Sequence, residues 1–138
     1  MADFFFTEGL DAQASGTFNF ASSTMKARLI ASSATPTQDD LAMNATALST
    51  GIGTDPTLGS KTVTNDTTNN RMVLDCADLQ WTGLSSGATA GWVVIYYSTG
   101  TDATSIPLIA LDITNTDLTA VVTLNVIIAA TGLGYIST

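Results

Sequence analysis

The chain has no histidine, one cysteine and only four basic residues among its 138 residues. Most enzymes that work near neutral pH use an imidazole, a thiolate, a lysine amine or a metal held by such groups. A serine or threonine nucleophile would find no histidine base and no lysine in a motif position. The composition therefore predicts a protein that is not an enzyme, with no cofactor and no small-molecule substrate.

Positive charge is scarce, and 12 acidic residues leave a net charge of −8 at pH 7. Nucleic acids and anionic membranes repel such a protein at long range, and counterion release needs basic side chains. A membrane helix needs about 20 consecutive apolar residues, whereas the longest apolar runs here have the length of a strand. The N-terminus has no basic region of the kind that opens a secretory signal. We therefore expect no nucleic-acid or membrane partner, and synthesis in a cytoplasm.

Threonine is abundant, with 24 threonines and 12 serines, while only 12% of residues are charged. Threonine is β-branched and favours pleated, half-buried surfaces. Short apolar segments recur along the chain with polar turns between them, which is typical of sandwiches and barrels. The sequence predicts one all-β domain over residues 1–138, an antiparallel β-sandwich or a partly open barrel. One or two short helical turns are expected near the N-terminus.

The first 30 residues contain a predicted helix and two predicted strands. Phe6 and Leu10 are four residues apart, which suits a short helix that ends near Gly16. The alternative for residues 1–16 is an aromatic arm that reaches a neighbouring subunit. A strand is expected to begin at 17–20. The clearest amphipathic strand is 24–30, which places Lys26 and Arg28 together on its solvent-facing side.

Residues 31–60 are rich in Ser, Thr, Asn, Gly and Pro, and we expect an extended loop region there. A helical turn is possible at 38–45, with Thr37 as its N-cap. Loops of this length in a compact domain are often contact or assembly elements.

The second half of the chain is regular. Asn tolerates positive φ, so 67–70 is expected to form a hairpin turn between two strands. The continuous apolar run Trp92–Tyr97 indicates a central strand that is covered on both sides. A turn is expected at 114–117, between later strands. The strands expected in this half are 62–66, 71–76, 79–81, 92–97, 106–113, 120–128 and 132–136.

Two carboxylate pairs are candidates for chemistry. Asp75 and Asp78 could ligate Ca²⁺ together with loop carbonyls, although aspartates at strand ends commonly cap turns. Asp75 and Asp112 could form a glycosidase-like pair if the strands brought them together. Neither pair lies in a recognised motif, and we expect no metal site and no catalytic residue.

Four aromatic residues could line a sugar-binding face: Trp81, Trp92, Tyr96 and Tyr97. In a strand, Trp92 and Tyr96 point to one side and Tyr97 points to the other. Packing in the core or against another subunit explains these side chains more simply.

The order of segments resembles that of a group of small structural proteins of tailed bacteriophages. The resemblance covers the chain from about Thr24 to its end and is strongest from Ala88 to Asp112. The segments that carry it are Thr24–Leu29, Gln38–Leu41, Lys61–Thr64, Arg71–Asp75, Asp78–Trp81, Ala88–Tyr97, Thr99–Thr101 and Pro107–Asp112. The resemblance implies a virion component without enzymatic activity.

From this resemblance we expect a capsid decoration (cement) protein, made in the host cytoplasm and bound as a homotrimer to the major capsid protein on the outer surface of the head. Phe4, Phe5 and Phe6, together with Ile52 in the 31–60 loop, are the expected contacts with the capsid or with neighbouring protomers. A tail, neck or fibre-anchoring module is the first alternative. A carbohydrate-binding module that uses exposed Trp81 or Trp92 is the second.

Overall fold

The computed structural model describes residues 3–84, 87–121 and 123–137. Within them the chain forms antiparallel sheets and one short helix, which confirms the all-β prediction. The described part contains no helix that is long and apolar enough to cross a bilayer. The elements are β1 Phe4–Phe5, α1 Thr7–Ser15, β2 Met25–Ala31, β3 Thr62–Asp66, β4 Arg71–Asp75, β5 Leu79–Trp81, β6 Thr89–Tyr97, β7 Ile106–Asp117, β8 Leu124–Val126 and β9 Gly134–Ser137.

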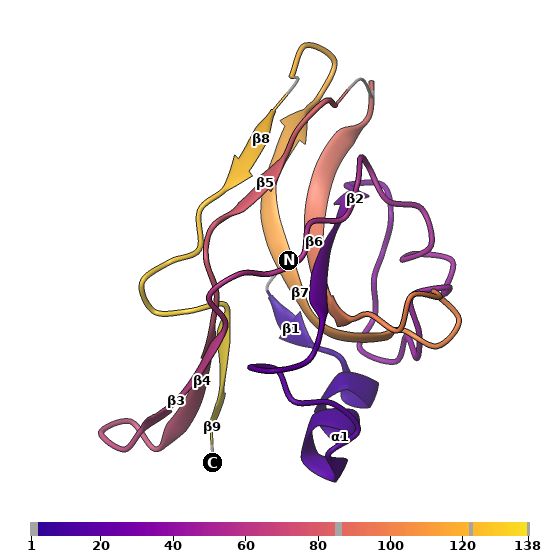
Figure 1. Cartoon of the computed structure of the whole chain (residues 1–138). Helices are drawn as coiled ribbons and strands as arrows, with labels where there is room; N and C mark the ends of the chain where they lie inside the picture. Colours follow the sequence, from indigo (N-terminus) through magenta and orange to yellow (C-terminus); the bar gives the residue numbers. More distant parts are fainter. Residues whose placement is uncertain (1–2, 85–86, 122, 138) are drawn as a thin grey trace.

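A four-stranded antiparallel sheet forms the first layer, in the order β1-β7-β6-β2 (Figure 1). Its central strand β6 contains the apolar run predicted from the sequence, and every residue from Ala90 to Tyr96 is buried. Side chains alternate along β6, so Val93 and Ile95 pack in one core cluster while Trp92 and Tyr96 pack in another. The strand is therefore covered on both faces, as the continuous run indicated.

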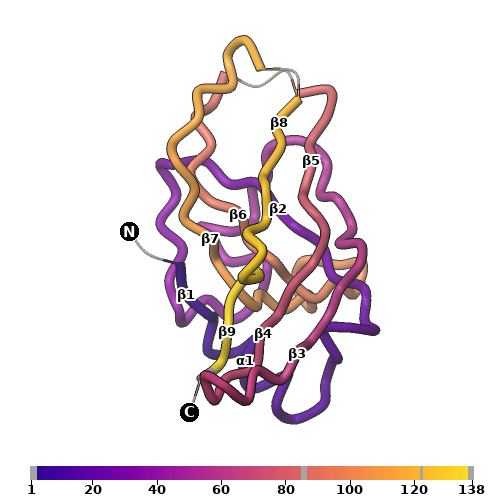
Figure 2. The backbone as a smooth tube through the Cα atoms, turned by 90° about the vertical axis from the view of Figure 1, so that its left-hand side faces the viewer, coloured from indigo at the N-terminus to yellow at the C-terminus, as the bar shows by residue number. Residues whose placement is uncertain are grey.

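The second layer is a long ribbon that crosses one face of this sheet (Figures 1 and 2). β4 leads into β5 and β8 leads into β9, so that the sheets β3-β4-β9 and β5-β8 follow one another along the ribbon. Leu74, Leu79 and Trp81 of the ribbon share a core cluster with Val93 and Ile95 of the first sheet. The fold is thus a two-layered antiparallel sandwich. Asn70 has a φ of 52° in the β3–β4 turn, where the sequence predicted a hairpin.

Residues 32–50 cover the other face of the four-stranded sheet. Met43 and Leu48 are fully buried there against Phe6 and Trp92. The helical turn predicted at 38–45 does not form. Instead, the carboxylate of Asp40 accepts the backbone N–H of Thr37, which closes a turn.

The segment 52–58 lies along the outer edge of β2. The N–H groups of Ile52 and Leu58 donate to the carbonyls of Leu29 and Met25, and Ala27 N–H donates to the carbonyl of Pro56, at 2.8–3.0 Å. These bonds run antiparallel to β2 and satisfy backbone groups that an edge strand would otherwise leave open. The loop region predicted at 31–60 is therefore packed onto the sheet as a cover for its face and its edge.

Helix α1 ends at Gly16, which takes a left-handed conformation with φ 79°. The helix packs on β7 at Gly9, where an added Cβ would lie 2.3 Å from the carbonyl oxygen of Pro107. The predicted short helix and its end are both found. Phe4 and Phe5 precede it as a short strand that pairs with Ala110 and Ile109.

Three predicted boundaries are wrong. Residues 17–20 form a loop after the helix and not a strand, and Phe18 and Phe20 of this loop are buried in the core. The turn predicted at 114–117 is absent, because β7 continues to Asp117 and, after an irregularity in register, pairs with β6 again at Thr116 and Asp117. The strand predicted at 120–128 includes only the three residues of β8 among the described residues. Polar residues that are compatible with a turn remain in a strand when a neighbouring strand supplies hydrogen bonds.

Candidate functional site

The densest group of charged side chains is built around Arg28 of β2. The sequence predicted that this residue faces solvent, but it is only 9% exposed. The prediction was wrong because the segment that follows β2 folds back over this side of the sheet. The side chain of Arg28 therefore extends from β2 to the 41–55 segment and to the turn that joins β6 to β7.

The guanidinium of Arg28 bridges two carboxylates. Nε donates to Oδ2 of Asp55 at 2.9 Å, while Nη1 and Nη2 donate to the two carboxylate oxygens of Asp102 at 2.9 and 3.0 Å. Nη1 also donates to the carbonyl oxygen of Leu48 at 3.1 Å, and the hydroxyl of Tyr96 donates to Oδ2 of Asp55 at 2.6 Å. We call Arg28, Asp55, Tyr96 and Asp102 the Arg28 clasp.

Two pKa shifts follow from this arrangement. Burial alone would lower the pKa of Arg28, but the hydrogen bonds with Asp102 and the charge of Asp55 outweigh burial and raise that pKa above its ordinary value. Burial, together with the hydrogen bond to Asp55, raises the pKa of the Tyr96 hydroxyl above its ordinary range. Arg28 therefore stays charged and Tyr96 stays protonated at neutral pH, so neither supplies a base or a phenolate.

A polar hollow of about 350 Å³ opens beside the clasp. Lys26, Ser49, Thr54 and Ser98 line it together with the clasp residues. Each hydroxyl here would need an adjacent general base to become a nucleophile, whereas the neighbouring carboxylates of Asp55 and Asp102 are bound to Arg28. The clasp has a structural role: ion pairs of one buried cation, Arg28, hold β2 to two segments without regular secondary structure.

The predicted contact residues divide into two pairs. Phe6 is fully buried and Ile52 is 7% exposed, so both side chains belong to the core of the chain in this structure. The prediction that Phe6 and Ile52 make direct surface contacts is therefore wrong for this structure. Phe4 and Phe5 are half-buried and remain accessible on β1.

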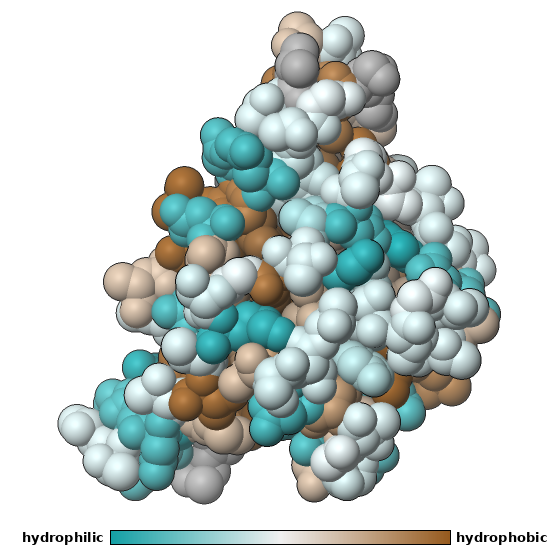
Figure 3. Space-filling model, viewed as in Figure 1, coloured by the Kyte–Doolittle hydropathy of each residue, from teal (hydrophilic) through white to brown (hydrophobic). Residues whose placement is uncertain are grey.

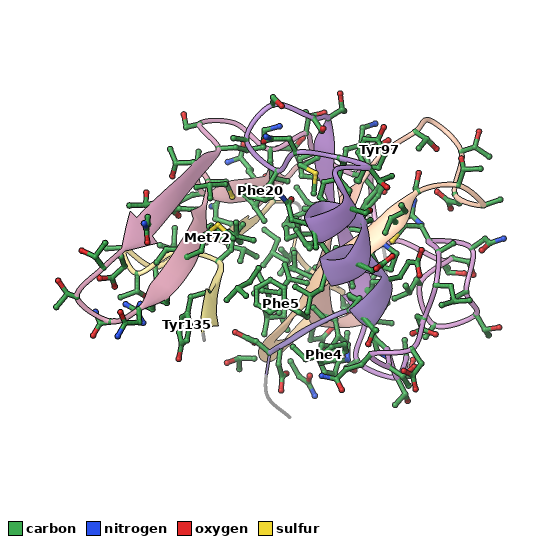
Figure 4. The ribbon with its side chains drawn as sticks, turned by 90° about the horizontal axis from the view of Figure 1, so that it is seen from below. Phe4, Phe5, Phe20, Met72, Tyr97 and Tyr135 are labelled. Atoms are coloured by element: carbon green, nitrogen blue, oxygen red, sulfur yellow. The ribbon has the colours of Figure 1, made fainter. Side chains whose placement is uncertain are left out.

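Phe4 and Phe5 line an apolar groove of about 440 Å³ between β1 and β9. Figure 4 shows the two rings on β1 and the ring of Tyr135 on β9. Tyr135 is 51% exposed, and its ring lies under the guanidinium of Arg71 at 4.5 Å. We call this feature the β1–β9 groove; the residues that line it are Asp3, Phe4, Phe5, Ile109, Leu133, Gly134 and Tyr135.

The two carboxylate pairs considered from the sequence have local roles. Asp75 accepts the backbone N–H of Cys76, and Asp78 accepts that of Ile128 at 2.8 Å. Asp112 lies on β7 and lines a small hollow with Trp92 and Asn115, of which Asp75 is not part. Among the described residues, no three or more Asp, Glu, Cys or His side chains are placed to hold a metal ion.

The aromatic residues do not form a sugar-binding face. Trp81 is 1% exposed, Trp92 is 5% exposed and Tyr96 is also buried. Tyr97 is stacked on Phe18 with ring centroids 5.1 Å apart. The carbohydrate-binding alternative required Trp81 or Trp92 at the surface, and the structure rules out that arrangement.

The cysteine is not an accessible nucleophile. Cys76 is buried in the core. Burial, with the negative charges of Asp75 and Asp78, raises the pKa of its thiol to about 12. The reactive thiolate is therefore almost absent at neutral pH.

Sequence reasoning missed Asp55 and Asp102 as partners of Arg28. They lie 27 and 74 residues away along the chain, one in a glycine-rich loop and the other in a turn. The available signal was an arginine flanked by apolar residues, Ala27 and Leu29, in a strand, since buried arginines need a paired carboxylate. That signal predicts a partner but does not identify it.

No family model, no curated protein and no solved structure matches this chain.

Proposed function

We propose that this chain is a non-catalytic structural protein of a tailed-bacteriophage virion: a capsid decoration protein that binds the major capsid protein on the outer head surface as a homotrimer. The observation that carries the proposal is the Arg28 clasp. The largest cluster of charged groups among the described residues is centred on the buried Arg28, which holds loops onto a sheet and engages both carboxylates of the cluster.

The distribution of covering elements also supports a structural role. The long segment after β2 has no regular secondary structure, yet it buries Met43 and Leu48 and is anchored by a charged group. A protein that reinforces a shell under internal pressure needs such rigidity. Loops that open and close around a substrate are instead drawn from weakly packed regions.

The surface is compatible with a protein that must not bind packaged DNA. The net charge is −8, and two of the four basic residues, Arg28 and Arg71, are already paired with carboxylates. The face in Figure 3 is mostly polar, and its apolar patches are small and separated. Association is therefore expected at limited sites, of which the β1–β9 groove is one.

Immunogold electron microscopy of purified phage particles tests this proposal. An antibody against the chain should label the outer surface of the head, and particles from a phage that lacks the gene provide the matched control. Label on the tail or neck would support the alternative virion role. Absence of label from every part of the particle would overturn the proposal.

The trimer is tested separately on the purified protein. Three chains of 14.2 kDa should give a native mass of about 43 kDa by light scattering. A mass of one chain at all attainable concentrations would contradict the trimer and leave the location on the particle to the labelling experiment.

A further inference from the structure

The peptide bond between Asp55 and Pro56 lies at the Arg28 clasp. The chain has three prolines, and only Pro56 follows an aspartate. Asp–Pro is the most acid-labile peptide bond in proteins, for two chemical reasons. The carboxyl group of an aspartate reaches the backbone carbonyl carbon of its own residue through a five-membered ring, so the attack is intramolecular. Proline then leaves as a secondary amine, and its nitrogen accepts a proton more readily than that of an ordinary amide.

The fold holds both halves of this bond in place. Oδ2 of Asp55 accepts Nε–H of Arg28 at 2.9 Å and the hydroxyl of Tyr96 at 2.6 Å, and the side chain is only 13% exposed. On the other half, the carbonyl oxygen of Pro56 accepts the backbone N–H of Ala27 at 3.0 Å. Rotation of the carboxylate toward the backbone breaks the first two bonds, and departure of the proline breaks the third. The folded chain therefore opposes the attack and the separation of the products.

The charges around Asp55 make this protection sensitive to acid. Arg28 and Lys26 face it from β2, Tyr96 faces it from β6, and Asp102 faces it from the turn between β6 and β7. At neutral pH, Asp55 pairs with Arg28 as a carboxylate, which has no proton to give to the prolyl nitrogen. In acid, both carboxylates gain protons and their ion pairs with Arg28 weaken. Acid therefore loosens the clasp and supplies the proton that the leaving group needs.

We propose that the Asp55–Pro56 bond is a self-cleavage site that the Arg28 clasp keeps intact at neutral pH and that acid opens. A carboxyl oxygen of protonated Asp55 attacks the backbone carbonyl carbon of the same residue, and the carboxyl proton passes to the prolyl nitrogen as the C–N bond breaks. Pro56 becomes a free amine, and Asp55 becomes a cyclic anhydride. One water molecule then opens the anhydride to two carboxyl groups, so the net reaction is hydrolysis.

The cut divides the chain without dismantling the sheet. Residues 1–55 include α1, β1 and β2, whereas the remaining strands lie in residues 56–138. β2 is paired with β6 along its whole length (Figure 1), so the two fragments should stay together as one folded molecule. The segment 52–58, which covers the edge of β2, would become two chain ends, and such ends fray. The covered edge of β2 would therefore become accessible after cleavage.

Acid incubation of the purified chain with and without urea tests the site. At about pH 3, below the sequence pI of about 4.1, the chain has a positive net charge that keeps it in solution. Mass spectrometry under denaturing conditions measures the rate at which fragments 1–55 and 56–138 appear. In buffer, the wild-type chain should be cut at least about tenfold more slowly than in urea, because cleavage follows the population of the opened segment. The native mass of the cut protein should equal that of the intact protein.

Four variants separate the clasp from general stability. Tyr96→Phe removes one donor to Asp55 and Arg28→Met removes the cation, so both should be cut faster than wild type in buffer, and Arg28→Met should approach the rate in urea. Gly9→Ala destabilises the helix packing away from the clasp and should be cut at the wild-type rate. Asp55→Glu retains a carboxylate but needs a larger ring for the attack, so it should stay intact in both solvents. Circular dichroism at the same pH shows which variants are folded.

Each contrary result overturns a defined part of the inference. Equal wild-type rates in buffer and in urea would show that the clasp gives no protection. Equal acceleration in Gly9→Ala and Arg28→Met would show that cleavage follows unfolding of the whole chain, which also removes the role of the clasp. No cut after Asp55 in urea, or an equal cut in Asp55→Glu, would overturn the chemistry. The location of the chain on a virion is decided separately by the labelling experiment.

Discussion

Arg28 shows how one residue can hold several parts of this fold together. Its side chain contacts Asp55 and the carbonyl of Leu48 in the 41–55 segment, and Asp102 in the turn that joins β6 to β7. Buried ion pairs are costly to form, and loss of one partner leaves the other desolvated without compensation. The stability of the covering segments therefore depends on a single cation.

Arg28→Met should lower the free energy of unfolding by about 2–4 kcal/mol, because Asp55 then loses its cation in a buried setting. The estimate is kept below the value for a fully buried pair because Asp102 is 41% exposed. Urea denaturation measures the change. The matched control is Arg71→Met, which breaks the more exposed pair with Asp66 and should cost much less, because solvent screens such a pair. Equal losses in the two variants would contradict the role assigned to Arg28.

Tyr96 should make stability depend on alkaline pH. The folded state raises the pKa of its hydroxyl above the ordinary value, through burial and the hydrogen bond to Asp55. In the unfolded chain the hydroxyl ionises near pH 10, so above that pH the unfolded state has lost a proton that the folded state keeps. The free energy of unfolding should then fall by up to about 1.4 kcal/mol per pH unit.

Denaturation series between pH 9 and pH 11 measure this dependence. The buried Cys76 thiol, whose pKa is also raised, contributes a slope of the same sign. Tyr96→Phe should therefore remove only the part of the slope that arises above about pH 10 from Tyr96, whereas Tyr135→Phe, at an exposed position, should retain the full slope. A wild-type slope that is unchanged in Tyr96→Phe would show that another group is responsible.

At the scale of elements, the helix depends on one close approach. α1 packs on β7 through Gly9, and an added Cβ would lie 2.6 Å from Cα of Leu108 as well as against the carbonyl of Pro107. Backbone atoms in a paired strand cannot move aside without loss of hydrogen bonds. The short β1 strand before the helix pairs with the same β7, so both elements depend on that surface.

Gly9→Ala should therefore destabilise the protein even though alanine favours helix. Overpacking costs about 1–3 kcal/mol, of which helix propensity returns about 1 kcal/mol, so we expect a net loss of up to about 2 kcal/mol in thermal or urea unfolding. Gly59→Ala is the control, since an added Cβ there meets nothing within 4 Å and φ is not positive. A stabilised Gly9→Ala variant would show that the helix stands farther from β7.

At the scale of the whole molecule, the single chain encloses a hydrophobic core of its own. Its accessible surface is 6945 Å², close to the roughly 6,800 Å² expected for a compact monomer of this mass. Among the described residues, only Leu41, Val63, Ile127 and Tyr135 are large apolar side chains with high exposure. Any assembly would therefore add contacts at the surface of a chain whose core is already buried.

The net charge should control the solubility of the free protein. The sequence pI is about 4.1, and the charge of −8 at pH 7 disappears as the carboxylates gain protons. Proteins near zero net charge associate and precipitate, so turbidity should rise sharply as the pH falls from 6 to about 4. Salt at pH 7 should have little effect on turbidity. Constant solubility across this range would indicate that association does not depend on net charge.

The sequence by itself determined the fold class and most of the strands. An unbroken apolar run over Trp92–Tyr97 suits a strand covered on both faces, and that property depends only on the residues within it. Gly16 indicated the end of a helix and Asn70 indicated a hairpin turn, because few residues adopt positive φ without strain. Such preferences act over a few residues, so they are readable without the fold.

Only the tertiary structure decided which side chains are buried in the covering segments. Lys26 and Arg28 have the same position in the alternating pattern of their strand, yet one is half-buried and the other joins a buried ion pair. Phe6 and Ile52 were predicted to be contact residues but are buried in the core, because distant segments of the chain pack over them. The surroundings of a side chain are set by what the chain places across from it. Here those partners come from segments without periodicity, as many as 74 residues away.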